Sequence, residues 1–181
     1  MEAVYIDKHL HLVEECRKAN RKAQFEIYKL YAKAMYNVAL RILAQEAEAE
    51  DVLQEAFLDA FTRIDSFRGE TTFGLWLKQI VINKSINQLR KRKAEFISID
   101  GIDVAAEETV PFDDLEMKVN EIRDAVSKLP DGYRVVLTLY LFEGYDHEEI
   151  AHILKISENT SRSQYMRAKV KLNSLLAKRG A

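Results

Sequence analysis

Residues 146–169 read DHEEIAHILKISENTSRSQYMRAK, a stretch with the dimensions of two short helices joined by a tight turn. Ala151 is small enough to let the two helices cross closely, and Ile150 supplies an apolar contact between them. Ser157 or Asn159 can cap the second helix, because either side chain accepts a hydrogen bond from the free amides of the first turn. The stretch therefore predicts a helix-turn-helix.

The second helix of this unit has two distinct faces. At 100° per residue, an inward stripe contains Ser161, Tyr165, Ala168, Leu172, Leu175 and Leu176, and the opposite face contains Arg162, Ser163, Met166 and Arg167. In a recognition helix the first two turns enter the major groove, where an arginine discriminates guanine by about 1–3 kcal/mol. Lys169 and Lys171 flank that face and suit phosphate contacts. An amphipathic helix with a solvated basic face has the same pattern, so the residues alone leave both interpretations open.

The turn between the two helices has an unusual residue. Lys155 occupies the position where glycine is usual, which predicts a positive φ at a residue that carries a side chain. Ser161 also stands where an apolar residue would pack better.

Upstream, residues 67–83 read FRGETTFGLWLKQIVIN and are followed by the basic run QLRKRK at 88–93. Rings mixed with cations and amides suit single-stranded DNA, because bases stack on aromatic rings while amides bond base edges. Before them, residues 51–61 read DVLQEAFLDAF, an amphipathic helix with an acidic and glutamine-bearing outer face.

The fold class expected from periodicity is all-α. Helical spacing predicts helices over about 23–43, 47–64, 72–93, 115–129, 133–142, 146–154 and 160–178. Residues 94–115 lose this spacing and contain Gly101 and Pro111. We therefore expect two small helical domains, 1–93 and 116–181, joined by a flexible acidic linker at 94–115.

Charge is segregated along the 181 residues in a way that the net value of −2 conceals. Residues 1–93 carry 16 Lys/Arg against 13 Asp/Glu, residues 94–121 carry 1 against 9, and residues 122–181 carry 10 against 7. Two mildly basic modules thus flank an acidic connector, a pattern that suits contact with nucleic acid on both sides.

Several classes of protein are disfavoured by composition. The single cysteine, Cys16, excludes an internal disulfide, and the histidines lack the helical spacing of a metal-binding pair. No apolar run approaches the ~18 residues needed to span a bilayer, so we expect a cytoplasmic protein without metal or cofactor.

Three motifs together resemble a known family. They are D-x-x-Q-E-x-F at 51–57, F-R-G-E-x-x-F-x-x-W-L at 67–77 and T-x-R-S-Q-x-x-R-A-K at 160–169. In this order and spacing they resemble the sigma-70 family of bacterial RNA polymerase sigma factors, and within it the short extracytoplasmic-function type that has only domains 2 and 4. The resemblance covers about residues 23–93 and 116–178.

The resemblance implies roles for individual residues. Docking on the beta-prime clamp helices of core polymerase is implied for Asp51, Gln54, Glu55, Phe57 and Leu58. Recognition and melting of the −10 element, with Asn83 facing a flipped base and Phe67 walling its pocket, are implied for Phe67, Arg68, Trp76, Lys78, Asn83, Lys84, Asn87, Arg90 and Arg92. Reading of the −35 element is implied for Arg162, Ser163, Gln164, Met166, Arg167 and Lys169.

Two departures from the family bear on the −35 element. Gln164 replaces an arginine that is common there, and Asn159-Thr160-Ser161 replaces the frequent Gly-Thr-Val. The −35 sequence preference therefore stays open. For Trp76, Phe73, Phe57 and Phe61 we expect a role in the core first.

The implied function is that of a non-enzymatic transcription initiation factor. It would bind core polymerase through the clamp helices and the beta flap, direct it to promoter DNA at −35 and −10, and assist strand opening without nucleotide hydrolysis. An anti-sigma factor that wedges between the two modules and holds the chain at the inner membrane is a further expected partner.

Two other classes of protein account for less of the sequence. A stand-alone dimeric helix-turn-helix regulator explains residues 116–178 but not the FRGETTFGLWL segment. An enzyme built on a helical bundle lacks any paired metal motif, nucleophile elbow or activated cysteine in the sequence.

Overall fold

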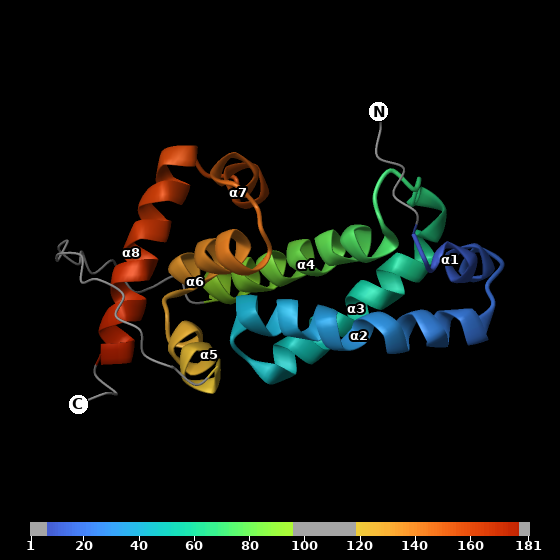
Figure 1. The fold of residues 1–181 in the computed structure, drawn as a ribbon, viewed down its shortest axis with the longest axis horizontal. Coiled ribbons are helices and arrows are strands. Elements are labelled where there is room, and N and C mark those ends of the chain that lie inside the picture. The colour runs from blue at the N-terminus through green and yellow to red at the C-terminus, as the bar shows by residue number, and fades with distance from the viewer. Residues whose placement is uncertain (1–6, 96–118, 178–181) are drawn as a thin grey trace. The chain divides into compact units, whose positions relative to one another are not determined.

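The computed structural model describes residues 7–95 and 119–177, and every regular element within these ranges is helical (Figure 1). The predicted all-α class is confirmed. The chain divides into two compact units, the first formed by residues 1–40 and 45–88 and the second by residues 41–44 and 89–181. The predicted linker lies outside the described residues from 96 onward, and the helix before it extends to Glu95.

The first unit is built from helices α1 (Leu10–Arg17), α2 (Arg21–Leu43), α3 (Glu46–Thr62) and α4 (Phe73–Glu95), with a short 3₁₀ turn η1 (Ile64–Ser66). Helices α2, α3 and α4 match the predicted ranges to within two residues at each end. Helix α1 was not predicted, because its only buried side chains are Val13 and Cys16 and two positions give no clear periodicity.

The core of the first unit comes from the inner faces of the three long helices. The predicted apolar stripe of α3 is confirmed, because Ala49, Val52, Leu53, Ala56, Phe57 and Ala60 are all buried. Among the apolar residues at helical spacing in 23–43, two lie outside the core: Phe25 is 59% and Tyr28 39% exposed, whereas Ile27 is fully buried. Residues two positions apart on a helix point about 200° away from each other. The inward row therefore passes through Ile27 and Met35 and leaves Phe25 outside.

Cys16 lies in this core. Its side chain is 3% exposed, and burial raises the pKa of its thiol. A thiol in such surroundings is inert toward disulfide exchange and alkylation, because the reactive species is the thiolate.

The second unit contains helices α5 (Val119–Ser127), α6 (Asp131–Leu137), α7 (His147–Leu154) and α8 (Glu158–Ala177). A π-helical turn η2 (Thr138–Phe142) extends α6. The interruption predicted between the helices 115–129 and 133–142 is shorter than expected, because α6 begins at Asp131 and includes Gly132. Proline pre-sets the backbone entering a helix, and the Arg134 amide donates to the carbonyl oxygen of Pro130 at 2.9 Å.

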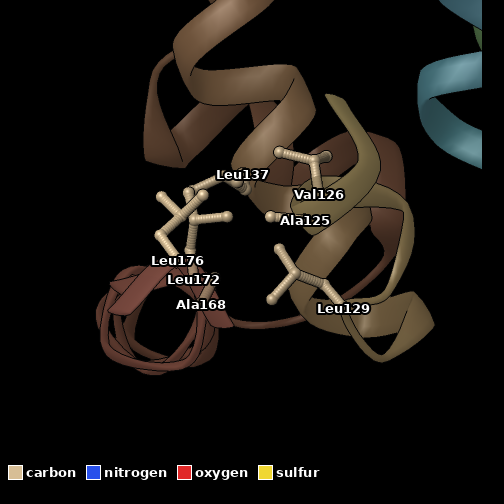
Figure 2. Close-up of a cluster of buried hydrophobic side chains, with 7 residues drawn as sticks. All are labelled: Ala125, Val126, Leu129, Leu137, Ala168, Leu172 and Leu176. Atoms are coloured by element: carbon tan, nitrogen blue, oxygen red, sulfur yellow. The ribbon is translucent and has the colours of Figure 1, made fainter. Parts of the chain in front are cut away.

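Helix α8 is the centre of the second unit and contacts α5, α6 and α7. Figure 2 shows its inward side chains facing those of α5 and α6 in one apolar cluster: Ala125, Val126, Leu129, Leu137, Ala168, Leu172 and Leu176. Tyr165 and Leu175 pack against the same cluster. The inward stripe predicted for α8 is therefore confirmed, and it leaves the opposite face of the helix in solvent.

Candidate nucleic-acid interfaces

The local sequence fixes the start and end of helix α7. At its start Asp146 and Glu149 form a capping box: the Glu149 amide donates to Asp146 Oδ1 at 2.8 Å, and the Asp146 amide donates to Glu149 Oε2 at 2.9 Å. At its end Lys155 adopts the left-handed conformation, with φ +57° and ψ 45°, as the turn predicted. Ser157 then caps α8, since its Oγ accepts from the Thr160 amide at 3.0 Å.

The exposed face of α8 carries four of the residues expected to read the −35 element. Arg162, Ser163, Met166 and Arg167 are all exposed and lie on the first turns of the helix. Arg162 is ion-paired with Glu158 one turn earlier. The structure thus brings these four together on one surface, which we call the α8 face.

Gln164 and Lys169, also expected at the −35 element, lie differently. The amide oxygen of Gln164 is buried, has no hydrogen-bond partner among the described residues, and faces α6, where a Cβ added to Gly132 would be 2.9 Å away. Lys169 is half-buried, with its Nζ 4.8 Å from the ring centroid of Tyr165. Both side chains border the α8 face rather than form it.

Behind the α8 face lies a polar and aromatic cluster that sequence reasoning missed. His147 Nδ1 lies 2.9 Å from the hydroxyl of the fully buried Ser161, so this hydrogen bond joins α7 to α8. The His147 ring stacks on Tyr140 at 4.6 Å between centroids, and Tyr140 packs on Tyr165 at 4.5 Å. Burial raises the pKa of Tyr165. The one signal in the sequence was serine at an inward position.

In the first unit, helix α4 presents a polar row to solvent. Gln79, Asn83 and Asn87 are exposed at intervals of four residues, and Arg90 and Lys91 continue the row. Asn83, Asn87 and Arg90 were expected to contact the −10 element, and this spacing places them on one face. Gln79 was not singled out, although it stands four residues before Asn83. We call this surface the α4 row.

The residues expected at the −10 element in the loop before α4 and in the first turns of α4 differ in their exposure to solvent. Phe67 is 2% exposed and packs against Phe73 and Trp76, with ring centroids 5.7 and 5.5 Å away. Arg68 is exposed, and Trp76 and Lys78 are half-buried. As expected, Phe73 and Trp76 contribute to the core. A pocket wall formed by Phe67 stays a prediction, because its ring is enclosed here.

Lys84 is engaged within the unit. Its Nζ lies 2.8 Å from Asp59 Oδ2 and 3.6 Å from Glu55 Oε2, so it ties α4 to α3. The hydrogen bond from Lys84 holds the pKa of Asp59 below its usual value. Arg92 is half-buried. Of Lys84, Arg90 and Arg92, the α4 cations implied at the −10 element beyond Asn83, Arg90 is the one that is exposed.

The outer face of α3 matches the expected polymerase-binding residues in part. Asp51, Gln54 and Glu55 are exposed, and Leu58 is 68% exposed beside them. Phe57 lies beneath, 3% exposed, with its ring centroid 4.8 Å from that of Tyr28. Asp51, Gln54, Glu55 and Leu58 recur at helical spacing and so share one exposed face of α3. We call it the α3 patch.

The described ranges 7–95 and 119–177 contain no group of three or more side chains suited to hold a metal ion. Within the same ranges, the helices are too short or too polar to span a bilayer.

Comparison with known proteins identifies both units. Residues 27–95 match the family profile "Sigma-70 region 2", and residues 120–172 match "Sigma-70, region 4". The chain is 32% identical over 177 residues to the ECF RNA polymerase sigma factor SigW of Bacillus subtilis, covering 91% of this chain and 94% of that one. It is 34% identical to SigM of the same organism over 152 residues, covering 83% and 93% of the two chains.

A solved structure agrees. The sigma factor RpoE of Bartonella quintana, crystallised with the anti-sigma factor NepR, superposes with a TM-score of 0.58 at 25% identity, covering 84% of this chain and 95% of that chain. Two region matches in order, relatives above 30% identity over most of both chains, and the shared helical fold lead to one assignment. The chain belongs to the sigma-70 family, as an RNA polymerase sigma factor of the extracytoplasmic-function (ECF) group.

Proposed function

We propose that this chain binds core RNA polymerase through the α3 patch and directs it to promoters through the α4 row at −10 and the α8 face at −35. The domain division that goes with this role is 1–93 for polymerase binding and −10 recognition, 94–115 as a flexible linker, and 116–181 for −35 recognition. The observation that supports it most is a pair of exposed polar faces in separate compact units: the amides Gln79, Asn83 and Asn87 of the α4 row lie in the first unit, and the α8 face lies in the second.

The two faces suit different forms of DNA. On the α8 face, Arg162 and Arg167 flank Met166 and Ser163, a set that fits base edges and methyl groups in the major groove. On the α4 row, the exposed amides of Gln79, Asn83 and Asn87 recur once per helical turn, which fits hydrogen bonds to the edges of unpaired bases. Capturing a flipped base offsets the few kcal/mol of unstacking, so strand opening requires no nucleotide hydrolysis and the chain acts without being an enzyme.

Either face alone is small, and the net charge of each module is modest. Core polymerase would hold the two units apart at the distance between the promoter elements, so that their affinities combine through effective concentration. The free chain is then expected to bind duplex DNA poorly. This property separates the role from that of a dimeric regulator, which binds a palindrome on its own.

Regulation by a partner is part of the proposal. The Bartonella quintana sigma factor forms a complex with an anti-sigma factor in its crystal. By analogy, we expect this chain to be cytoplasmic and to be sequestered, until released, by an anti-sigma protein at the inner membrane.

In-vitro transcription on a pool of randomised promoters, with core polymerase and with or without the chain, tests the function. Starts at a fixed distance from two enriched boxes, present only with the chain, would support it. Arg167→Ala should then relax the upstream box, and Asn83→Ala the downstream one, while Lys128→Ala, an exposed lysine paired with Asp124, serves as a control outside both faces. Starts independent of the chain, together with dimeric binding to duplex DNA, would establish the regulator instead.

A further inference from the structure

The loop Phe67–Phe73 carries the FRGETTF motif, and side chains from residues 7–17, which we call the N-terminal segment, form hydrogen bonds to both of its ends. Arg17 Nη2 donates to the carbonyl oxygen of Phe67 at 2.5 Å. Asp7 Oδ2 accepts from the backbone amide of Phe73 at 2.6 Å. The residues between these anchors, from Arg68 to Thr71, are exposed.

Each anchor is itself fixed in place. Arg17 Nη1 donates to Glu14 Oε1 at 2.8 Å, which orients the guanidinium. The second carboxylate oxygen of Asp7 accepts from the His9 amide at 2.9 Å, just before α1 begins. The Asp7 carboxylate thus lies at the start of both α1 and α4, where the positive end of a helix dipole favours an anion.

A second layer supports the same point. The Tyr31 hydroxyl lies 2.9 Å from His9 Nδ1, and its ring lies 5.7 Å from that of Phe73. A Cβ added to Gly74 would be 2.8 Å from Tyr31 Cε1, so this ring leaves room only for glycine. The first turn of α4 is therefore fixed against both the N-terminal segment and α2.

The N-terminal segment contributes little to the core. Only Val13 and Cys16 of α1 are buried, whereas the bonds of Asp7 and Arg17 reach backbone atoms at the two ends of the loop. Hydrogen bonds that involve a charged group are the strong ones, so their loss should loosen the loop more than it destabilises the unit.

We infer that Asp7 and Arg17 are positioning residues for −10 recognition: they hold the ends of the Phe67–Phe73 loop so that Arg68–Thr71 and the start of α4 meet the promoter strand in one geometry. The inference rests on the proposed function, because it requires this loop to contact the −10 element. In the proposed arrangement α1 contacts no DNA. The inference nevertheless makes this helix, through Arg17, one of the elements that determine −10 specificity.

The test uses the full chain with core polymerase on a parent promoter from the randomised pool and on its single-base variants. The variants are Arg17→Gln and Asp7→Ala, with Lys18→Gln as a matched control. Lys18 lies next to Arg17 in an exposed ion pair with Glu15 and does not contact the loop. The readout is the ratio of transcription between preferred and substituted bases, which does not depend on the amount of folded protein.

We expect −10 discrimination to fall about three- to ten-fold in both variants, the size expected for losing a charge-assisted hydrogen bond. Discrimination at −35 should not change, Lys18→Gln should behave as the parent, and Arg17→Lys should restore part of the loss. If Asp7→Ala does not fold, the two Arg17 variants decide alone.

Two results would overturn the inference. One is −10 discrimination that stays at the parent value although the variants are folded; the other is −10 and −35 discrimination falling together, which indicates a general structural role. A parent chain with no −10 preference would instead refute the proposed function, so the two failures are distinguishable.

Discussion

Lys155 carries a side chain although its backbone adopts a conformation that usually requires glycine. Its φ of +57° lies in the left-handed region, which costs a residue with a Cβ about 1–2 kcal/mol relative to the right-handed helix. The conformation ends α7 and lets the Ile156 amide donate to the carbonyl oxygen of Ala151 at 3.1 Å. The turn of the helix-turn-helix is therefore formed against local preference and is maintained by the packing around it.

Lys155→Gly should stabilise the second unit. The relief of strain exceeds the extra chain entropy that glycine loses on folding, so the free energy of unfolding should rise by about 0.5–1 kcal/mol. Denaturant unfolding followed by circular dichroism measures the change. Lys155→Ala is the matched control, because it removes the side chain but keeps the Cβ, and an equal gain in that variant would contradict the explanation.

Gln164 offers a second test at a single position. Its buried amide oxygen lacks a partner among the described residues, and its side chain turns toward α6. Gln164→Met should leave −35 preference in the transcription assay unchanged and should raise stability by up to about 1 kcal/mol, since an unpaired buried oxygen is removed. A changed base preference would return Gln164 to the residues that read DNA.

The crossing of α7 and α8 depends on a hydrogen bond in place of a purely apolar contact. Ser161 is fully buried, and its hydroxyl meets His147 Nδ1 at 2.9 Å. The His147 ring stacks on that of Tyr140 and meets that of Tyr165 edge-on, so both tyrosine rings pack against the histidine. An inward serine, which looked unfavourable in the sequence, is accommodated because the histidine at the start of α7 satisfies it.

A double-mutant cycle on His147→Leu and Ser161→Ala should reveal this coupling. Either single change leaves a polar group without its partner, Ser161 buried or His147 half-buried, and should cost about 1–3 kcal/mol, whereas the double variant loses both groups and should cost less than the sum. Unfolding by denaturant gives the three values. Strict additivity would show that the two side chains contribute independently.

The tie between α3 and α4 should depend on pH. The hydrogen bond from Lys84 lowers the pKa of Asp59, so the folded state binds this proton less readily than the unfolded state does. The resulting stability is present above the usual aspartate pKa of about 3.9 and is lost as pH falls through the lower folded value. Since the pair is partly exposed, its contribution is at most about 1 kcal/mol.

Asp59→Asn checks this assignment. The variant should be slightly less stable than the parent at pH 7, and the difference should vanish as the pH is lowered below the depressed pKa of Asp59 in the folded state. Asp65→Asn, an exposed residue of η1, is the control and should show no such convergence. A difference between parent and Asp59→Asn that is constant with pH would argue against the Lys84 pair.

Across the whole chain, Gln79, Asn83 and Asn87 of the α4 row lie in the first compact unit, the α8 face lies in the second, and the two surfaces share no residues. Mutations at independent sites add within about 0.5 kcal/mol, whereas coupled sites deviate further. The separation into units therefore predicts that the two promoter elements are read independently once polymerase is bound.

Arg167→Ala and Asn83→Ala should accordingly combine multiplicatively. The loss of transcription in the double variant, on a promoter that carries both preferred boxes, should equal the product of the two single losses to within about two- to three-fold. If the double variant loses no more transcription than the more impaired of the two single variants, one element dominates recognition.

The parts of the fold and of the candidate sites that could be predicted from sequence are those with a regular apolar periodicity. Helices α3 and α8 have regular apolar stripes, so their faces, including Arg162 and Arg167, were predicted and found. The hydrogen bonds of Asp7 and Lys84 could not be predicted, because they join segments that are distant in the chain and leave no local pattern. The burial of Phe67 could not be predicted for the same reason. Its motif implied a DNA-contacting surface, whereas tertiary packing encloses its ring.

The buried state of Cys16 has a practical consequence. Because the only native thiol is enclosed and its pKa is raised, a maleimide dye added to the folded chain should react with a newly introduced cysteine and leave this one alone. Ser174→Cys would place the labelling position on an exposed turn of α8 beyond the α8 face. Fluorescence from that dye could then follow promoter engagement in real time, without first removing the native cysteine.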